Sequence, residues 1–126
     1  NNSNKCIWTK DIEQIHLPIA HGEGNFYTND ETLEKIKADD QIVFRYVKPD
    51  GSAANQQLPH NPNGAMEDIA GICDPTGLVF GLMPHPEAAY ATFLHPEHTR
   101  GEVSEEILAE GMQIFRNAVE YAQANL

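Results

Sequence analysis

Residues 69–83, IAGICDPTGLVFGLM, carry the clearest local signal in the chain. Two apolar runs, Ile69–Cys73 and Leu78–Met83, flank the turn sequence DPTG at residues 74–77. Proline and glycine are favoured in β-turns, so this stretch predicts a β-hairpin. Both arms are almost continuously apolar, which predicts strands that are buried on both faces.

Regular elements are also expected on both sides of the hairpin. Gln41–Val47 has the pattern of a strand, and Asp30–Ala38 has the pattern of an amphipathic helix with Asp30 as its N-cap. Two short strands are expected at Cys6–Thr9 and Gln14–Ile19. Ser104 is expected to cap a long helix that runs to near the C-terminus. The apolar stripe of that helix is predicted to consist of Ile107, Leu108, Met112, Phe115, Val119 and Ala122. These elements predict an α/β fold with a mixed sheet and a C-terminal helix.

A chain of 126 residues suffices for one hydrophobic core and not for two, so we expect a single domain, and its composition is acidic. The formal net charge of −11 argues against binding to nucleic acid or to an anionic membrane. No apolar run approaches the ~20 residues of a membrane span. Cys6 and Cys73 are too few for a disulfide framework, so we expect a cytoplasmic protein. The chain begins with Asn1 rather than methionine, and we expect it to be cut from a longer protein.

The segment GLMPHPE, residues 81–87, carries the candidate chemistry. Proline disfavours the α conformation in the residue before it, so Met83 and His85 are expected to be extended. Residues two apart in an extended segment face the same way, about 6.6 Å apart along the chain, so Glu87 can reach one imidazole nitrogen of His85. A histidine oriented by a carboxylate is the base of a catalytic triad. His85 and Glu87 are therefore the candidate catalytic residues, placed where a buried strand ends.

Two observations weaken this motif when it is taken alone. The same tripeptide recurs at His95–Glu97, in a polar stretch that is typical of a solvated turn. The pattern His85-x-Glu87 is also similar to a zinc deaminase motif, but the chain has no Pro-Cys-x-x-Cys segment to complete such a site. We therefore predict no metal site.

A triad also needs a nucleophile, and neither cysteine fits that role well. A turn centred near Pro75 would place Cys73 opposite Leu78, and His85 would then lie roughly 23 Å further along the strand. Cys73 is expected to be a buried, inert residue. Geometry does not exclude Cys6, but no glycine-lined sharp turn exposes its sulfur. We expect the nucleophile to lie outside this chain.

Four segments, in this order and spacing, resemble one protein family. They are LPIAHGEGNFY (17–27), DQIVFRYV (40–47), NPNGAMEDIAGICD (61–74) and GLMPHPE (81–87). Together they are similar to the C-terminal half of the glutaminase subunit of phosphoribosylformylglycinamidine synthase, a class I glutamine amidotransferase. The resemblance implies that residues 1–126 form the C-terminal portion of a single domain with a flavodoxin-like fold. It also implies that the nucleophile-bearing N-terminal portion is absent.

The resemblance assigns roles to two groups of residues. The family uses a Cys-His-Glu triad, and His85 and Glu87 match its histidine and glutamate, while its Gly-x-Cys-Asn-Gly elbow has no match here. Related amidotransferases use a His-Gly-x loop to hold the α-carboxylate and amino group of glutamine through backbone groups. The matching candidate substrate-binding residues are His21, Gly22 and Glu23. A simple turn between a strand and a helix is the alternative for this loop.

The implied function is glutamine hydrolysis that supplies ammonia to a synthetase subunit, which converts formylglycinamide ribonucleotide to the amidine in purine biosynthesis. Glutamine and the synthetase subunit are then the partners, and ATP and magnesium belong to the synthetase, so no cofactor is expected on this chain. The chain alone is expected to be inactive. Two alternatives remain at this stage: a non-catalytic glutaminase-like module that docks on a synthetase, and a small metal-dependent hydrolase.

Overall fold

The computed structural model describes residues 1–22, 24–94, 99 and 110–125. The chain divides into two compact units, and both are built from separate stretches of sequence. The first unit comprises Asn1–Cys6 and His21–Met83, and the second comprises Ile7–Ala20 and Pro84–Leu126.

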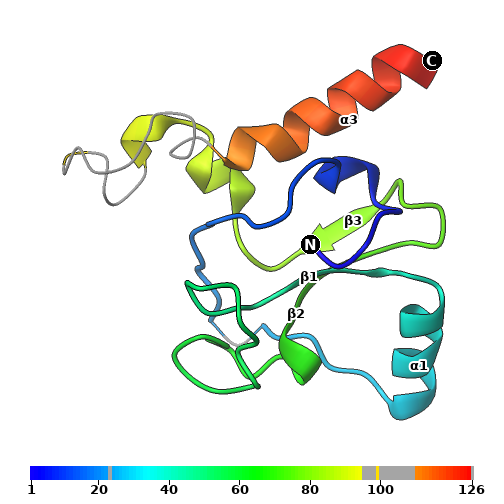
Figure 1. Ribbon diagram of the computed structural model, residues 1–126, viewed down its shortest axis with the longest axis vertical. Helices are drawn as coiled ribbons and strands as arrows, with labels where there is room; N and C mark the ends of the chain where they lie inside the picture. The colour runs from blue at the N-terminus through cyan, green and yellow to red at the C-terminus, as the bar shows by residue number, and fades with distance from the viewer. Residues whose placement is uncertain (23, 95–98, 100–109, 126) are drawn as a thin grey trace. The chain divides into compact units, whose positions relative to one another are not determined.

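The first unit contains a three-stranded antiparallel sheet in the order β1-β2-β3 (Figure 1). Strand β1 spans Ile42–Arg45, β2 spans Ile69–Cys73 and β3 spans Phe80–Leu82. The predicted hairpin is confirmed as the β2–β3 pair, and the predicted strand around residue 44 is confirmed as β1. Every pair among these strands is antiparallel, so the parallel pairing that a mixed sheet requires does not occur within the described residues.

Side-chain hydrogen bonds fix the turn of the hairpin. The Asp74 carboxylate accepts hydrogen bonds from the hydroxyl of Thr76 at 2.6 Å and from the backbone N–H of Val79 at 2.9 Å. These bonds, with that from Thr76 first, lower the pKa of Asp74 to about 2. Gly77 has a φ of 75°, and an added Cβ would lie 2.2 Å from the carbonyl oxygen of Lys5. The turn therefore requires glycine at this position.

Two details of the hairpin differ from the prediction. Burial on both faces holds for β2, but Val79 just before β3 is 67% exposed and Leu78 is 43% exposed. Cys73 pairs with Phe80 rather than with Leu78. Both differences have one cause, because the connection extends past the four turn residues and includes Leu78 and Val79, whose side chains then lie outside the paired strands.

Helix α1 spans Asp30–Ala38, which confirms the predicted amphipathic helix. Its N-cap is Asn29 rather than Asp30, since Oδ1 of Asn29 accepts a hydrogen bond from the N–H of Thr32 at 2.8 Å. Asp30 instead occupies the first turn, where a negative charge is favourable.

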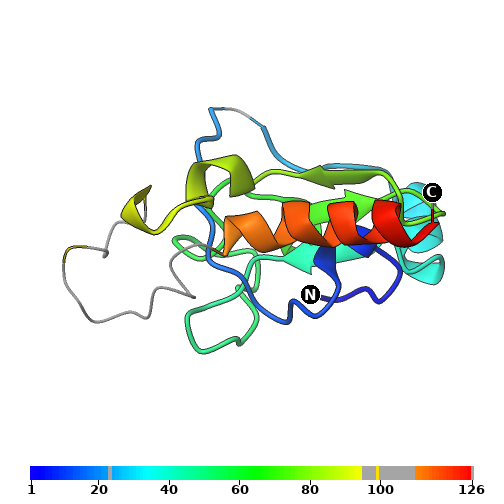
Figure 2. The ribbon, with the colours of Figure 1, turned by 90° about the horizontal axis from the view of Figure 1, so that it is seen from above.

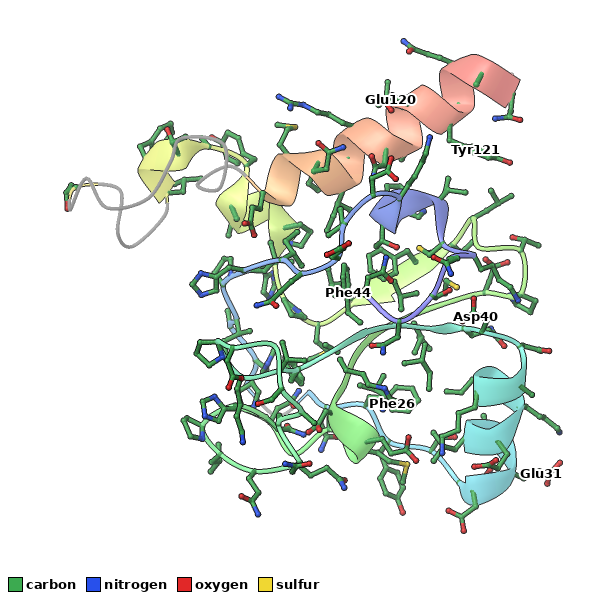
Figure 3. All side chains as sticks on the ribbon, viewed as in Figure 1. Phe26, Glu31, Asp40, Phe44, Glu120 and Tyr121 are labelled. Carbon is green, nitrogen blue, oxygen red and sulfur yellow. The ribbon has the colours of Figure 1, made fainter. Side chains whose placement is uncertain are left out.

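The core of the first unit lies between α1 and the sheet. Its buried members are Leu33, Ile36, Ile42 and Ile69, and Phe26 packs against them. Figure 3 shows Phe26 beside the strands, whereas Glu31 projects from the outer side of α1. Apolar side chains from a helix and two strands thus form one contiguous cluster.

The loop between β1 and β2 ends in a short 3₁₀ helix, η2 (Met66–Asp68), and is organised by the buried side chain of Asn61. The Asn61 amide donates to the carbonyl of Ala65 and to the carboxylate of Asp68, both at 2.9 Å. Its oxygen accepts from the N–H of Ala65 at 3.1 Å. Asn61 therefore satisfies buried polar groups of its own loop.

The two short strands predicted near the N-terminus are not formed. Residues Ile7–Thr9 form a 3₁₀ helix, η1, and Gln14–Ile19 belongs to no strand. The reason is that the backbone carbonyl groups of this segment accept hydrogen bonds from side chains and from isolated backbone N–H groups, and not from a neighbouring strand. The Asn117 amide donates to the carbonyls of Trp8 and Lys10 at 3.0 and 2.8 Å.

Helix α3 spans Gly111–Asn125 and runs unbroken through the second unit (Figure 2). The predicted cap Ser104 and the stripe residues Ile107 and Leu108 lie outside the described residues. Of the other predicted stripe residues, Met112 and Ala122 are half-buried and Phe115 and Val119 are exposed, so the stripe is only partly correct. The buried residues of α3 are Gly111, Ile114 and Asn117. Phe115 and Val119 are 37% and 56% exposed. The buried face was missed because it contains a glycine and an asparagine, which an apolar pattern does not count.

The second unit also contains two short 3₁₀ helices, η3 (Pro86–Ala89) and η4 (Thr92–Leu94). α3 packs against η1 and η3. Within the described ranges, no helix is both long enough and apolar enough to cross a membrane.

Candidate active site

The side chains of His85 and Glu87 meet in the second unit. Nδ1 of His85 lies 2.6 Å from Oε1 of Glu87. A carboxylate can only accept, so Nδ1 carries the proton and the neutral imidazole keeps its lone pair on Nε2. The hydrogen bond from His85 holds the pKa of Glu87 below its usual range. The predicted contact between the two side chains is confirmed, while their catalytic role stays a prediction.

The contact is made through a turn, whereas the sequence predicted an extended segment. His85 precedes η3 with φ −107° and ψ 89°, which lies outside the helical region that the following proline disfavours but is not fully extended. Pro86 then occupies the start of η3, where its fixed φ suits a helix. The chain turns at Pro86 and brings the Glu87 carboxylate back to the imidazole.

Backbone hydrogen bonds fix His85 on both sides. Its N–H donates to the carbonyl of Pro18 at 2.9 Å, and its carbonyl accepts from the N–H of Ala88 at 3.1 Å. The imidazole itself is partly exposed, at 41%, and the Glu87 side chain is 63% exposed. A base that is to reach a substrate needs this combination of a fixed backbone and an accessible side chain.

The loop predicted to bind substrate belongs to the first unit. Nε2 of His21 lies 3.2 Å from the hydroxyl of Tyr46, and the two rings meet edge to face. Nδ1 of His21 is buried and has no hydrogen-bond partner among the described residues. Burial raises the pKa of Tyr46. An added Cβ at Gly22 would meet nothing within 4 Å, and Glu23 lies outside the described residues.

Both cysteines are buried. Cys6 and Cys73 are each 3% exposed, and neither forms a disulfide. Burial, as the largest cause, raises the pKa of the Cys73 thiol to about 11. The predicted burial of Cys73 is confirmed, and its thiol lacks the low pKa and accessibility of a nucleophile.

Three residues that support the backbone of the second unit were not predicted from sequence. Pro18 receives the N–H of His85, Gly111 packs against η3, and Asn117 ties α3 to residues 8 and 10. The only signal for the last two was that a glycine and an asparagine interrupt an otherwise helical pattern. The second His-Pro-Glu copy, at residues 95–97, lies outside the described residues. Within the part of the chain that the structure describes, no group of three or more His, Cys, Asp or Glu could hold a metal ion.

Comparison with known proteins gives the family to which the chain belongs. A family model described as the CobB/CobQ-like glutamine amidotransferase domain matches residues 1–122. Because the match covers nearly the whole chain, the protein belongs to this family of glutamine amidotransferases. The fold class expected from sequence is confirmed by this match.

The curated relatives are named more specifically. A protein of Methanococcus maripaludis, phosphoribosylformylglycinamidine synthase subunit PurQ, is 47% identical over 95% of this chain and 47% of the relative. Proteins of the same name from Archaeoglobus fulgidus and Dehalococcoides mccartyi are 42% and 38% identical, over 96% and 98% of this chain and 44% and 46% of each relative. The resemblance seen in the sequence is thereby confirmed. The chain spans about half the length of the curated relatives it matches.

Proposed function

We propose that this chain is part of the glutaminase subunit of phosphoribosylformylglycinamidine synthase and supplies the histidine and glutamate of its catalytic triad. The observation that carries the proposal is the 2.6 Å contact between His85 Nδ1 and Glu87 Oε1 on a chain related to PurQ subunits. Neither the docking module nor the metal-dependent hydrolase is favoured by these relatives.

In the proposed reaction, a cysteine thiolate from outside these 126 residues attacks the side-chain amide carbon of glutamine. Nε2 of His85 takes the thiol proton and gives it to the departing nitrogen, which leaves as ammonia. The resulting glutamyl thioester is then hydrolysed by a water molecule that His85 deprotonates. Glu87 keeps the proton on Nδ1 and stabilises the imidazolium that forms in each step. The buried positions of Cys6 and Cys73 support an external nucleophile.

The remaining parts of the proposal concern substrate and partners. The His21–Gly22 loop is proposed to hold the amino-acid end of glutamine, which the open space at Gly22 and the buried Nδ1 of His21 support. Ammonia passes to a synthetase subunit that uses ATP and magnesium to make formylglycinamidine ribonucleotide, so this chain itself needs no cofactor. Free cysteines agree with a cytoplasmic location.

The test is glutamine hydrolysis by the full-length protein assembled with its synthetase. His85→Ala should lower kcat by a factor on the order of 10² to 10⁴, which is the usual contribution of a general acid–base group. Glu87→Gln should lower it less, because the histidine remains. His60→Ala, in the loop before η2, is the matched control and should leave turnover unchanged. Equal turnover in His85→Ala and His60→Ala would refute the proposed role of His85.

A further inference from the structure

Helix α3 begins directly against the turn that carries Glu87. Gly111 is the first residue of the helix and is buried. An added Cβ at this position would lie 2.1 Å from the carbonyl oxygen of Pro86 and 2.9 Å from that of Ala89. Backbone atoms cannot yield as a flexible side chain can, so only glycine allows α3 to begin here.

Pro86 and Ala89 are the two ends of η3, the turn that returns Glu87 to His85. Any side chain at residue 111 would have to separate α3 from η3 by about 1 Å to restore van der Waals contact. A displacement of this size is large compared with the tolerance of a 2.6 Å hydrogen bond. The spacing between α3 and η3 therefore bears directly on the His85–Glu87 contact.

The helix is also held further along the same buried face. The Asn117 amide donates to the carbonyls of Trp8 and Lys10, and its oxygen accepts from Gln113 at 2.8 Å. The same N-terminal segment supplies the Pro18 carbonyl that receives the N–H of His85. The segment thus fixes the His85 side of the pair, and α3 fixes the turn that bears Glu87.

Because the His85 and Glu87 side chains are exposed, their contact depends on how the backbone places them. The side chains of His85 and Glu87 are 41% and 63% exposed. Exposed ion pairs gain little free energy because solvent screens them and two side chains must be ordered. Burial of the pair therefore does not hold the contact together, and the placement of the backbone has to do so.

We propose that Gly111 is a positioning residue of the glutaminase reaction. By placing no side chain between α3 and η3, it sets the turn Pro86–Ala89 at the distance where Glu87 meets Nδ1 of His85. Gly111 touches neither substrate nor the reacting atoms, and it acts through Glu87. This inference rests on the proposed function of the His85–Glu87 pair.

The test is a double-mutant cycle in the full-length protein assembled with its synthetase. Gly111→Ala should lower the kcat for glutamine on the order of 10²-fold, as a misplacement of about 1 Å can, with little change in KM. In a Glu87→Ala background, which removes the acceptor of the Nδ1 hydrogen bond, the same substitution should lower kcat by less than about twofold, because the contact it disturbs is already lost. An equal factor in both backgrounds would overturn the role of Gly111.

Two glycine variants separate positioning from stability. Gly81→Ala is the matched control, because its Cβ would come no closer than 3.9 Å to another residue, and it should leave kcat unchanged. Gly77→Ala makes a clash of similar size in the other unit, so it should lower the unfolding temperature but change the kcat of the folded protein equally in both backgrounds. Coupling between Gly77→Ala and Glu87→Ala would show that any destabilisation mimics positioning, and would overturn the inference.

Failure of the proposed function, and failure of the Gly111 variant to fold, can both be distinguished from failure of this inference. If Glu87→Ala alone leaves turnover unchanged, the proposed function of the pair fails, whatever Gly111→Ala does. If Gly111→Ala does not accumulate as folded protein, Asn117→Ala takes its place, because it loosens α3 without adding a clash. Asn117→Ala should then also lose its effect on kcat in the Glu87→Ala background, and equal factors in the two backgrounds would overturn the inference.

Discussion

At the scale of single residues, Cys73 shows how burial suppresses chemistry that its side chain could otherwise perform. Its thiol pKa is raised from 9.0 to about 11, which lowers the thiolate fraction at neutral pH about 100-fold. In a Cys6→Ala background we expect iodoacetamide to label Cys73 at least this much more slowly in the folded protein than in urea. Equal rates in the two states would contradict the buried position.

The contact between His85 and Glu87 has a definite dependence on pH. The folded pKa of Glu87 is lowered, so the contribution of this carboxylate is present above its unfolded value of about 4.3 and is lost as pH falls through the folded value. A carbon NMR titration of the Glu87 carboxyl should give a midpoint below the ordinary one. In His85→Ala that midpoint should return to the ordinary range, and an unchanged midpoint would contradict the hydrogen bond.

At the scale of elements, the hairpin turn depends on the charge of Asp74. Its pKa is about 2 in the folded protein against about 3.9 in an unfolded chain. The stabilisation is therefore complete above about pH 4 and is lost as pH falls toward 2. Asp74→Asn should lower the unfolding midpoint at pH 7, and the difference from the parent should shrink across this acidic range. A difference that does not change with pH would show that the charge is irrelevant.

Helix α3 offers a test of which face is buried. Ile114 is 2% exposed, so Ile114→Ala should lower the free energy of unfolding by about 2–5 kcal/mol. Val119 is 56% exposed, and Val119→Ala should change that free energy by no more than about 0.5 kcal/mol. Urea unfolding of the two variants provides the measurement. The reverse order would restore the stripe predicted from sequence.

The elements that could be predicted from sequence are those whose determinants are local. The hairpin was found because its turn residues lie between its strands, and α1 was found because its apolar spacing is regular. The buried face of α3 was missed because the partners of Asn117 are Trp8 and Lys10, which are more than 100 residues away in sequence. The N-terminal strands were wrong for the same reason, since strand-like composition does not supply a neighbouring strand.

The candidate site likewise has one part that could be predicted from sequence and other parts that could not. The His85–Glu87 contact was predictable because the two residues are only two apart in sequence, although the turn at Pro86 that joins them was not predicted. Neither the support from Gly111 nor the pairing of His21 with Tyr46 could be predicted, because each joins residues that are distant in sequence. The assignment of the pair to glutamine chemistry came from the resemblance of four segments and not from the pair itself.

At the scale of the whole molecule, we expect the isolated chain to release no ammonia from glutamine above a His85→Ala control. A histidine without a thiol can activate only water, and covalent catalysis is absent. Supplying the nucleophile-bearing portion in trans should restore turnover, and His85→Ala should abolish the restored activity. Clear glutaminase activity of the pure 126-residue chain would point to Cys6 or to another residue as nucleophile.

The interleaving of the two units has a consequence for how the protein is made. The hydrogen bond between Asn117 and Trp8 closes 109 residues of chain, whereas the hairpin closes only a short turn. Long closures are slower and cost more chain entropy. On a ribosome that adds about 5–20 residues per second, residue 117 follows Glu87 by roughly 2–6 s. The hairpin can therefore form during translation before α3 emerges, and the His85–Glu87 pair reaches its final geometry only after the hairpin.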